Sequence, residues 1–193
     1  MAAFVVVTGG GRDLGRQRRV KNASRIWMSA NTRPDGRKRV VITGQGVVSC
    51  FGTDPDIFYD SLLEGKSGVK TVQKFDVESW NTKIAAEISP DVINAKDFVS
   101  PKLVRRLDPF LLYSIIGGKK ALIDAGLEPG SEANEALDKF RCGIISGSGM
   151  GGLKVYSAAA ETLNNRDFSR VSPFFIPYAI TNMGSGLLAI DLG

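Results

Sequence analysis

The sequence has no histidine among its 193 residues and only two cysteines, Cys50 and Cys142. Without histidine, the chain supplies no imidazole as a general base or a metal ligand. The two cysteines form no Cys-x-x-Cys pair and are too few for a disulfide framework, so neither a zinc site nor a cross-linked scaffold is expected. We expect both thiols to be buried and inert, in a reducing compartment.

Long hydrophobic runs are also missing. The longest apolar segment, around Phe110 to Ile116, is far shorter than the roughly 20 residues that cross a bilayer, so no membrane span is predicted. Apolar residues nevertheless make up 43% of the chain. A domain of this size typically buries roughly 70% of its unfolded surface. The composition therefore predicts a folded domain with its own core.

Acidic residues are scarce at the N-terminus. Residues 1–39 hold ten of the 25 lysines and arginines but only two of the 20 acids, so they carry a formal charge of +8 and the remainder carries −3. The mildly acidic body argues against nucleic-acid binding.

An arginine-rich, acid-poor start of this kind is typical of an organelle transit peptide. We predict a leader at 1–37 that directs the protein to the plastid (chloroplast) stroma. The alternatives are the mitochondrial matrix, a plain solvated tail and a misassigned start.

The body, residues 38–193, alternates strand-like and helical patterns. Apolar, β-branched runs ending in glycine predict strands at 39–44 and 141–146, and a weaker pattern lies at 83–88. Asp54-Pro55 and Asp108-Pro109 each combine a helix cap with a first-turn proline, which predicts helices that end near Gly65 and Gly126. A further helix begins at Leu153. This alternation predicts an α/β fold layered around a parallel or mixed sheet.

Two glycine loops look like nucleotide-binding motifs but fail in detail. Residues 7–15 resemble the loop of short-chain dehydrogenases, yet Asp13 stands where that pattern has glycine, and no tyrosine is followed four residues later by lysine. The run 147–152 lacks the Lys-Ser/Thr ending of a P-loop and is interpreted as a strand-to-helix turn. A separate glycine pair, Gly117-Gly118, lies inside a predicted helix and would cost that helix about 1 kcal/mol per glycine. The pair therefore predicts close packing of the helix against a neighbouring element.

Several segments, in a fixed order across residues 38–193, resemble the N-terminal half of β-ketoacyl-acyl-carrier-protein synthases. The segments are 39–49 (RVVITGQGVVS), 58–68 (FYDSLLEGKSG), 106–108 (RLD), 118–126 (GKKALIDAG), 142–152 (CGIISGSGMGG) and 172–193 (SPFFIPYAITNMGSGLLAIDLG). The resemblance implies a thiolase-like fold of two similar α/β halves stacked in layers. This chain would supply the N-terminal half only.

The resemblance also implies an activity in fatty acid biosynthesis. Members of the family move an acyl group to a cysteine at a helix N-terminus, decarboxylate malonyl-acyl-carrier protein and join the two in a Claisen condensation, with two histidines donating to the enolate. Neither Cys50 nor Cys142 matches that cysteine, and the sequence has no histidine. No catalytic residue is assigned, and we expect the chain alone to be an inactive fragment of an acyltransferase. The alternative is a non-catalytic, dimer-forming interaction protein derived from the synthase.

Two residues match the acyl pocket of the family. Met150, in the glycine run, matches a position that limits acyl chain length, and Phe175 matches an aromatic residue that reaches the channel across the dimer contact. The alternative for both is ordinary core packing. The implied partners are acyl-carrier protein, carrying acyl or malonyl groups, and a second copy in a homodimer. The resemblance implies no cofactor and no metal.

Overall fold

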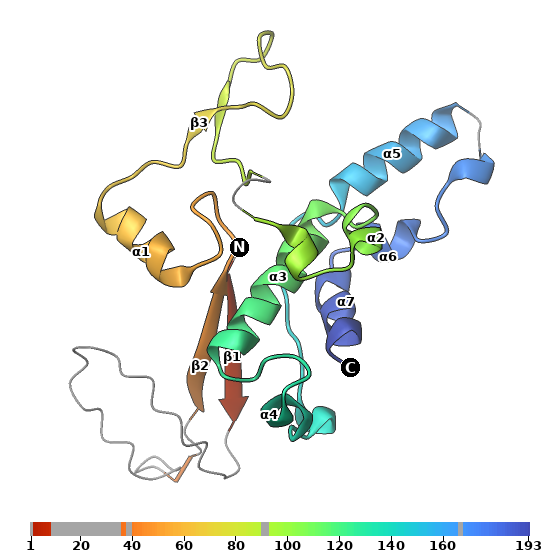
Figure 1. Ribbon diagram of the computed structural model, residues 1–193. Helices are drawn as coiled ribbons and strands as arrows, with labels where there is room; N and C mark the ends of the chain where they lie inside the picture. The colour runs from red at the N-terminus through yellow and green to blue at the C-terminus, as the bar shows by residue number, and fades with distance from the viewer. Residues whose placement is uncertain (1, 9–35, 38–39, 90–92, 166–167) are drawn as a thin grey trace.

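Helix α3 (Pro109–Asp124) lies at the centre of the structure, between a small sheet on one side and a second helix on the other (Figure 1). The computed structural model describes residues 2–8, 36–37, 40–89, 93–165 and 168–193. The sheet consists of β1 (Ala2–Thr8) and β2 (Val40–Val47), which pair antiparallel. The second helix is α7 (Met183–Leu192). Helix α3 is thus covered on two sides, by the sheet and by α7.

Glycines allow these layers to approach closely. A Cβ at Gly46 of β2 would lie 2.1 Å from the Gly117 carbonyl oxygen of α3, and one at Gly44 would lie 2.2 Å from the Ala121 carbonyl oxygen. On the opposite side of α3, a Cβ at Gly118 would lie 2.3 Å from Leu188 of α7. The predicted close packing of Gly117-Gly118 is therefore confirmed, and it involves both neighbours of the helix.

The apolar core follows the two sides of α3. Its larger cluster combines residues of α3 and α7 with buried residues from the segments beside them: Val99, Leu107, Leu111, Ile115, Tyr178 and Leu188. A smaller cluster joins Ile116 of α3 to Val48 and Ile93. Leu111, Ile116 and Val48 are the largest fully buried side chains among the described residues. The core therefore depends on α3 more than on the sheet.

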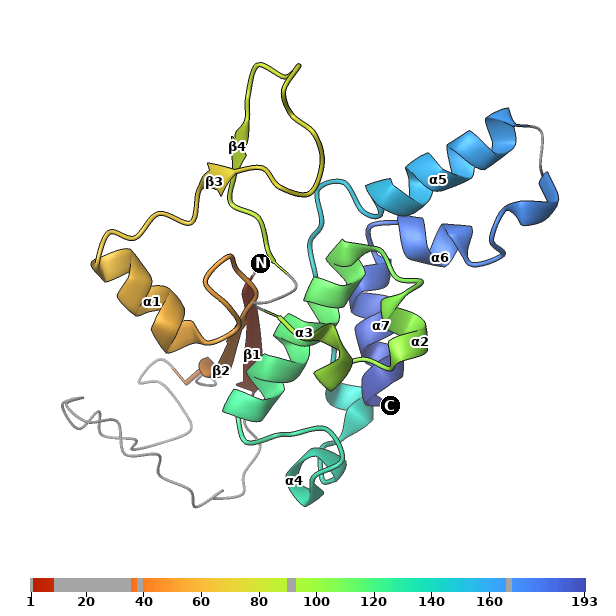
Figure 2. The ribbon, with the colours of Figure 1, turned by 45° about the horizontal axis from the view of Figure 1, so that its top comes forward.

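The remaining elements surround this centre. They are α1 (Pro55–Leu63), β3 (Lys70–Thr71) paired with β4 (Ile84–Ala85), the 3₁₀ helix at Ala95–Asp97, α2 (Pro101–Val104), α4 (Glu132–Glu135), the 3₁₀ helix at Lys139–Arg141, α5 (Leu153–Asn164), the 3₁₀ helix at Phe168–Arg170 and α6 (Phe175–Ala179). Figure 2 shows α5 and α6 side by side, projecting away from α3. No helix in the described part of the chain is both long and apolar enough to cross a membrane.

The expected strand at 141–146 is wrong. Residues 142–149 form no strand in the structure, although half-buried positions 144, 146 and 148 alternate with exposed ones as they would in a strand. The inner side contacts the core, since Ile144 packs against the larger cluster. A strand also needs a hydrogen-bonded neighbour, and no described segment pairs with this one. The expected parallel or mixed sheet is replaced by two antiparallel pairs, β1–β2 and β3–β4.

The other expected elements are present with shifted bounds. The strand expected at 39–44 is β2, which continues to Val47, and the weak pattern at 83–88 yields only the two residues of β4. The capped helices are α1 and α3, and the helix expected from Leu153 is α5. The division into a leader at 1–37 and a body at 38–193 stays a prediction; β1, within that leader, pairs with β2.

Candidate functional site

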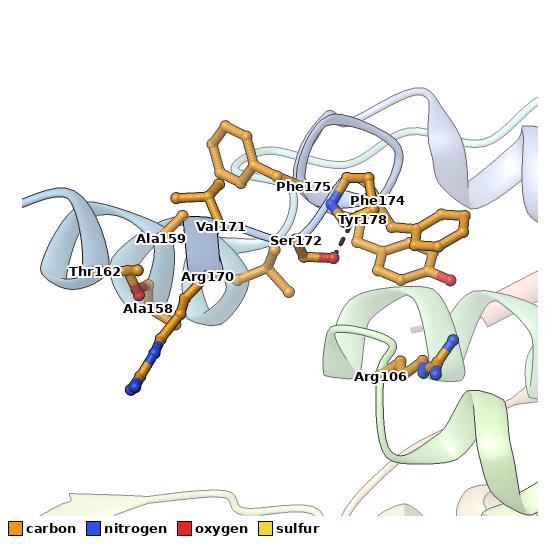
Figure 3. Close-up of a pocket in the computed structure, with 12 residues that line it drawn as sticks. Arg106, Ala158, Ala159, Thr162, Arg170, Val171, Ser172, Phe174, Phe175 and Tyr178 are labelled. Atoms are coloured by element: carbon orange, nitrogen blue, oxygen red, sulfur yellow. Dashed lines mark hydrogen bonds between the residues drawn. The ribbon is translucent and has the colours of Figure 1, made fainter. Parts of the chain in front are cut away.

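A cavity of about 540 Å³ lies between α5 and the segment that leads into α6. One wall is a face of α5 with positions spaced as i, i+3, i+4 and i+7, and the other is built by residues 170–178 with Arg106 at one edge (Figure 3). The lining residues are Arg106, Val155, Ala158, Ala159, Thr162, Arg170, Val171, Ser172, Pro173, Phe174, Phe175 and Tyr178. Most of this lining is apolar, which suits an apolar ligand with a polar end.

Aromatic rings build one wall of this cavity. The rings of Phe174 and Tyr178 stack, with centroids 5.6 Å apart and an interplanar angle of 15°. Phe175 contacts Tyr156 of α5 at a centroid distance of 6.0 Å, which joins the two helices. The turn into α6 is fixed locally, because the Phe174 amide donates to the Ser172 hydroxyl oxygen at 3.2 Å. Stacked and tilted rings of this kind add stability beyond their buried area.

The structure separates the two residues that the sequence assigns to the acyl pocket. Phe175 lines the cavity and is half-buried. Met150, within the glycine run, does not line it and is 73% exposed. Their roles in acyl binding remain proposals. Sequence patterns did not predict Arg106, Arg170 and Tyr178 as site residues, and no local signal marks them. The α5 wall does have a local signal, because positions 155, 158, 159 and 162 share one side of the helix.

The glycine run is held tightly against α6. Gly151 has a φ of +70°, and a Cβ there would lie 2.4 Å from the Ala179 carbonyl oxygen. A Cβ at Gly152 would lie 2.2 Å from the Tyr178 carbonyl oxygen, and the Gly152 amide donates to the Ala179 carbonyl at 2.9 Å. The predicted strand-to-helix turn thus leads into α5 as expected, but no strand precedes it. Its glycines are required by a positive φ and by contact with the α6 backbone.

Positive charge lies at the edge of the cavity. Arg106 and Arg170 both line it, and Figure 3 shows them well apart, with Arg106 near Phe174 and Tyr178 and Arg170 near Ala158 and Thr162. Lys102 and Arg105, on and just after α2, are exposed next to Arg106 in the sequence. An anionic group at the open end of a bound apolar chain would therefore meet guanidinium groups.

A second cavity, of about 620 Å³, lies between the segments on either side of α1 and the β3–β4 hairpin. Most of its lining residues are polar, and they include three lysines, Lys66, Lys70 and Lys74, together with Glu87. The Glu87 carboxylate accepts from the Gln73 amide at 2.9 Å, and Lys66 forms an ion pair with Glu64. This composition suits a polar or anionic group and not an apolar chain, so the α5–α6 cavity is the better site for acyl chemistry.

The cysteines differ from expectation. Cys142 is exposed and Cys50, which lines the second cavity, is half-buried, so the expectation of two buried thiols is wrong. Cys142 begins the segment that was expected to be an inner strand, and no strand that the structure describes pairs with this segment. Two other expectations concern metal and nucleotide binding. Among the residues that the structure describes, no three histidine, cysteine or acidic side chains lie close enough together to bind one metal ion. Residues 9–15 of the dehydrogenase-like loop at 7–15 lie outside the described residues.

Comparison with known sequences gives consistent matches over most of the chain. The family described as "Beta-ketoacyl synthase, N-terminal domain" matches residues 37–193. A chloroplastic 3-oxoacyl-[acyl-carrier-protein] synthase I of Hordeum vulgare is 51% identical over 159 residues, which are 82% of this chain and 34% of that protein. Its counterpart in Arabidopsis thaliana is 46% identical over 184 residues, 94% of this chain and 38% of that protein. The chain therefore spans little more than a third of these relatives.

Solved structures agree on the fold. A β-ketoacyl synthase from Burkholderia phymatum superposes with a TM-score of 0.64 at 22% identity, covering 81% of this chain and 37% of that one. A type II polyketide ketosynthase, solved in complex with its acyl-carrier protein, gives a TM-score of 0.58 at 21% identity over 80% of this chain and 40% of that one. The expected α/β, thiolase-like layered fold is confirmed by these similarities.

Proposed function

The chain belongs to the β-ketoacyl synthase family, and on that premise we propose that it forms the acyl-pocket part of a 3-oxoacyl-[acyl-carrier-protein] synthase. The observation that carries the proposal is the apolar, aromatic-walled cavity between α5 and α6. In the proposed reaction, decarboxylation of a malonyl thioester yields an enolate, which attacks the carbonyl carbon of an acyl thioester. The products are a 3-oxoacyl thioester, carbon dioxide and the released thiol.

The part of this chain in that reaction is binding and not bond making. The sequence has no histidine to stabilise an enolate, and no cysteine that matches the family nucleophile. The α5–α6 cavity would take the alkyl end of the acyl group, because its lining is mainly aliphatic and aromatic. Phe175 would form a wall of this pocket, and Met150 would limit the chain from the adjoining glycine run.

An acyl-carrier protein is the proposed partner. The exposed cations Lys102 and Arg105 lie next to Arg106, which lines the cavity, so an acidic carrier docked there would present its acyl chain to the pocket. The polyketide ketosynthase similar in fold was solved with such a carrier. We further propose a homodimer and a location in the plastid stroma, with the mitochondrial matrix as the alternative; chloroplastic relatives favour the plastid.

A non-catalytic interaction protein is the second candidate. The absence of histidine favours it, since a chain without this residue retains binding surfaces but not the groups that act on the enolate. Under this alternative the chain would bind a synthase partner, and the acyl group on a carrier would not affect its affinity. Acyl dependence of carrier binding therefore separates the two functions.

The test compares binding of a hexadecanoyl-loaded carrier protein and of the unloaded carrier to the 193-residue chain by calorimetry. We expect tighter binding of the loaded carrier, and we expect Phe175→Ala to reduce that difference by about tenfold, as the loss of one aromatic wall predicts. Phe75→Ala is the matched control, because Phe75 contacts Trp80 outside the cavity. Equal affinities for the loaded and the unloaded carrier would contradict the proposal.

A further inference from the structure

The carboxylate of Asp108 connects α3 to α5, which forms one wall of the α5–α6 cavity. It is buried, with 4% of its surface exposed. One oxygen, Oδ1, accepts from the Phe110 amide at 3.2 Å, the usual cap of its own helix, α3. The other, Oδ2, accepts from the Lys154 and Val155 amides at 3.1 and 3.3 Å. These two amides lie in the first turn of α5, so one side chain caps both helices.

Helix α5 cannot provide this cap from its own N-cap residue. That residue is Gly152, which has no side chain. A serine or aspartate there would place a Cβ 2.2 Å from the Tyr178 carbonyl oxygen. The Leu153 amide donates to the Gly151 carbonyl, but the Lys154 and Val155 amides receive no side-chain cap from Gly152, and Asp108 provides their acceptor from a distant part of the chain.

The position of Asp108 relates this cap to the cavity. Arg106 lies two residues before it, the Val155 backbone amide donates a hydrogen bond to it, and both Arg106 and Val155 line the cavity. Gly152, at the start of the capped helix, follows Met150 by two residues in a run whose Gly151 amide donates to Ser148. Fixing the start of α5 therefore fixes the separation of the cavity walls and the path of the glycine run.

We propose that Asp108 is a positioning residue for the acyl pocket: by capping α3 and α5 together, it holds the wall of α5 at the distance from Arg106 and from α6 that an acyl chain requires. Its effect on acyl binding rests on the proposed function, whereas its effect on α5 does not. The carboxylate acts through the two helices and does not itself contact the ligand, since it is not part of the cavity lining.

Asp108→Asn tests the proposal, because an amide retains one acceptor oxygen but turns an NH₂ donor toward one of the two sets of backbone amides. Asp54→Asn is the matched control: Asp54 caps α1 through the Asp56 and Ile57 amides and is remote from the cavity. Both variants remove one N-cap carboxylate charge, but Asp54 accepts both amides through Oδ1, which asparagine retains, so Asp54→Asn controls for the loss of charge with the cap kept.

Two measurements on the 193-residue chain keep the outcomes distinct. In hydrogen exchange, Asp108→Asn should accelerate exchange of the Lys154 and Val155 amides about tenfold, and Asp54→Asn should not. With the fluorescent fatty acid cis-parinaric acid, Asp108→Asn should weaken binding about tenfold relative to both the wild-type chain and Asp54→Asn. Asp108→Ala removes both acceptor oxygens, so wild-type exchange at Lys154 and Val155 in Asp108→Ala would overturn the proposal, as would unchanged probe affinity in that variant. A wild-type chain that binds no probe would count against the proposed function, and the exchange result would still decide the role of Asp108 in fixing α5.

Discussion

Burial and a neighbouring charge act together on Tyr113 of α3. The pKa of its phenol is raised above the ordinary value, first by burial and second by the Asp108 carboxylate. A folded-state pKa above the unfolded one means that the folded chain holds the proton more tightly. The contribution of this phenol to the free energy of unfolding is then fully present below about pH 10, and it is lost as the pH rises from there through the raised folded-state pKa.

We therefore expect Tyr113→Phe to lessen the fall in melting temperature between about pH 9.5 and 11. Tyr59→Phe removes a phenol at a position that is 60% exposed and serves as the control. Thermal denaturation followed by circular dichroism in a series of alkaline buffers gives the slope for each variant. If Tyr113→Phe loses stability as steeply as the wild-type chain, the alkaline effect does not arise from this phenol.

The glycines around α3 differ in what an added methyl group would meet. At Gly46 the obstacle is the Gly117 carbonyl of the α3 backbone, whereas at Gly118 it is the end of the Leu188 side chain, which can rotate away. We expect Gly46→Ala to lower the free energy of unfolding by about 2–3 kcal/mol, the scale of overpacking in a core. Gly118→Ala should cost about 1 kcal/mol or less, because alanine gains about 1 kcal/mol of helix propensity over glycine.

Urea denaturation of the two variants measures this difference. Gly143→Ala is the control, since nothing lies within 4 Å of the position of its Cβ. A loss at Gly118 equal to that at Gly46 would show that the Leu188 side chain cannot move, and that it is held as rigidly as the α3 backbone carbonyl that obstructs Gly46.

At the scale of elements, local signals predicted the helices well and the sheet poorly. Asp54-Pro55 and Asp108-Pro109 marked the starts of α1 and α3 correctly because a cap and a first-turn proline act within four residues. The segment 141–146 has the composition of a strand, but no strand in the described part of the chain forms a hydrogen-bonded pair with it. Strand pairing depends on residues far away in the sequence. The same limit applies to burial: the apolar residues Ile57 and Leu62 of α1 are exposed, and whether an apolar helix face is covered depends on distant parts of the chain.

The candidate site was predictable in part for the same reason. Phe175 was found through the resemblance of its segment to the family, and it does line the cavity. The contributions of Arg106 and of the α5 face depend on how α2, α5 and α6 come together, which no local pattern contains. The cap that Asp108 gives α5 spans 46 residues of sequence, so the Asp-Pro signal revealed only its local half.

At the scale of the whole molecule, many large apolar side chains are exposed on the surface. Phe140 and Ile145 have relative exposures of 101%, and Ile190, Phe168 and Leu63 are also exposed. Exposed apolar side chains favour association where they adjoin one another or an unpaired backbone. Around Ile145 it is accompanied by backbone groups of an extended segment that pairs with no described strand, which is the kind of edge that promotes aggregation.

We therefore expect the 193-residue chain to associate with itself as its concentration rises, and Ile145→Lys to reduce that association, because a lysine on an unpaired edge opposes strand addition. Light scattering with size-exclusion chromatography gives the mass at each concentration. Glu135→Lys adds positive charge at an exposed position on α4, away from the 142–149 segment, and serves as the control for a general effect of charge. A chain that stays monomeric throughout, or an equal reduction by both variants, would show that the edge at Ile145 is not the surface through which the molecules associate.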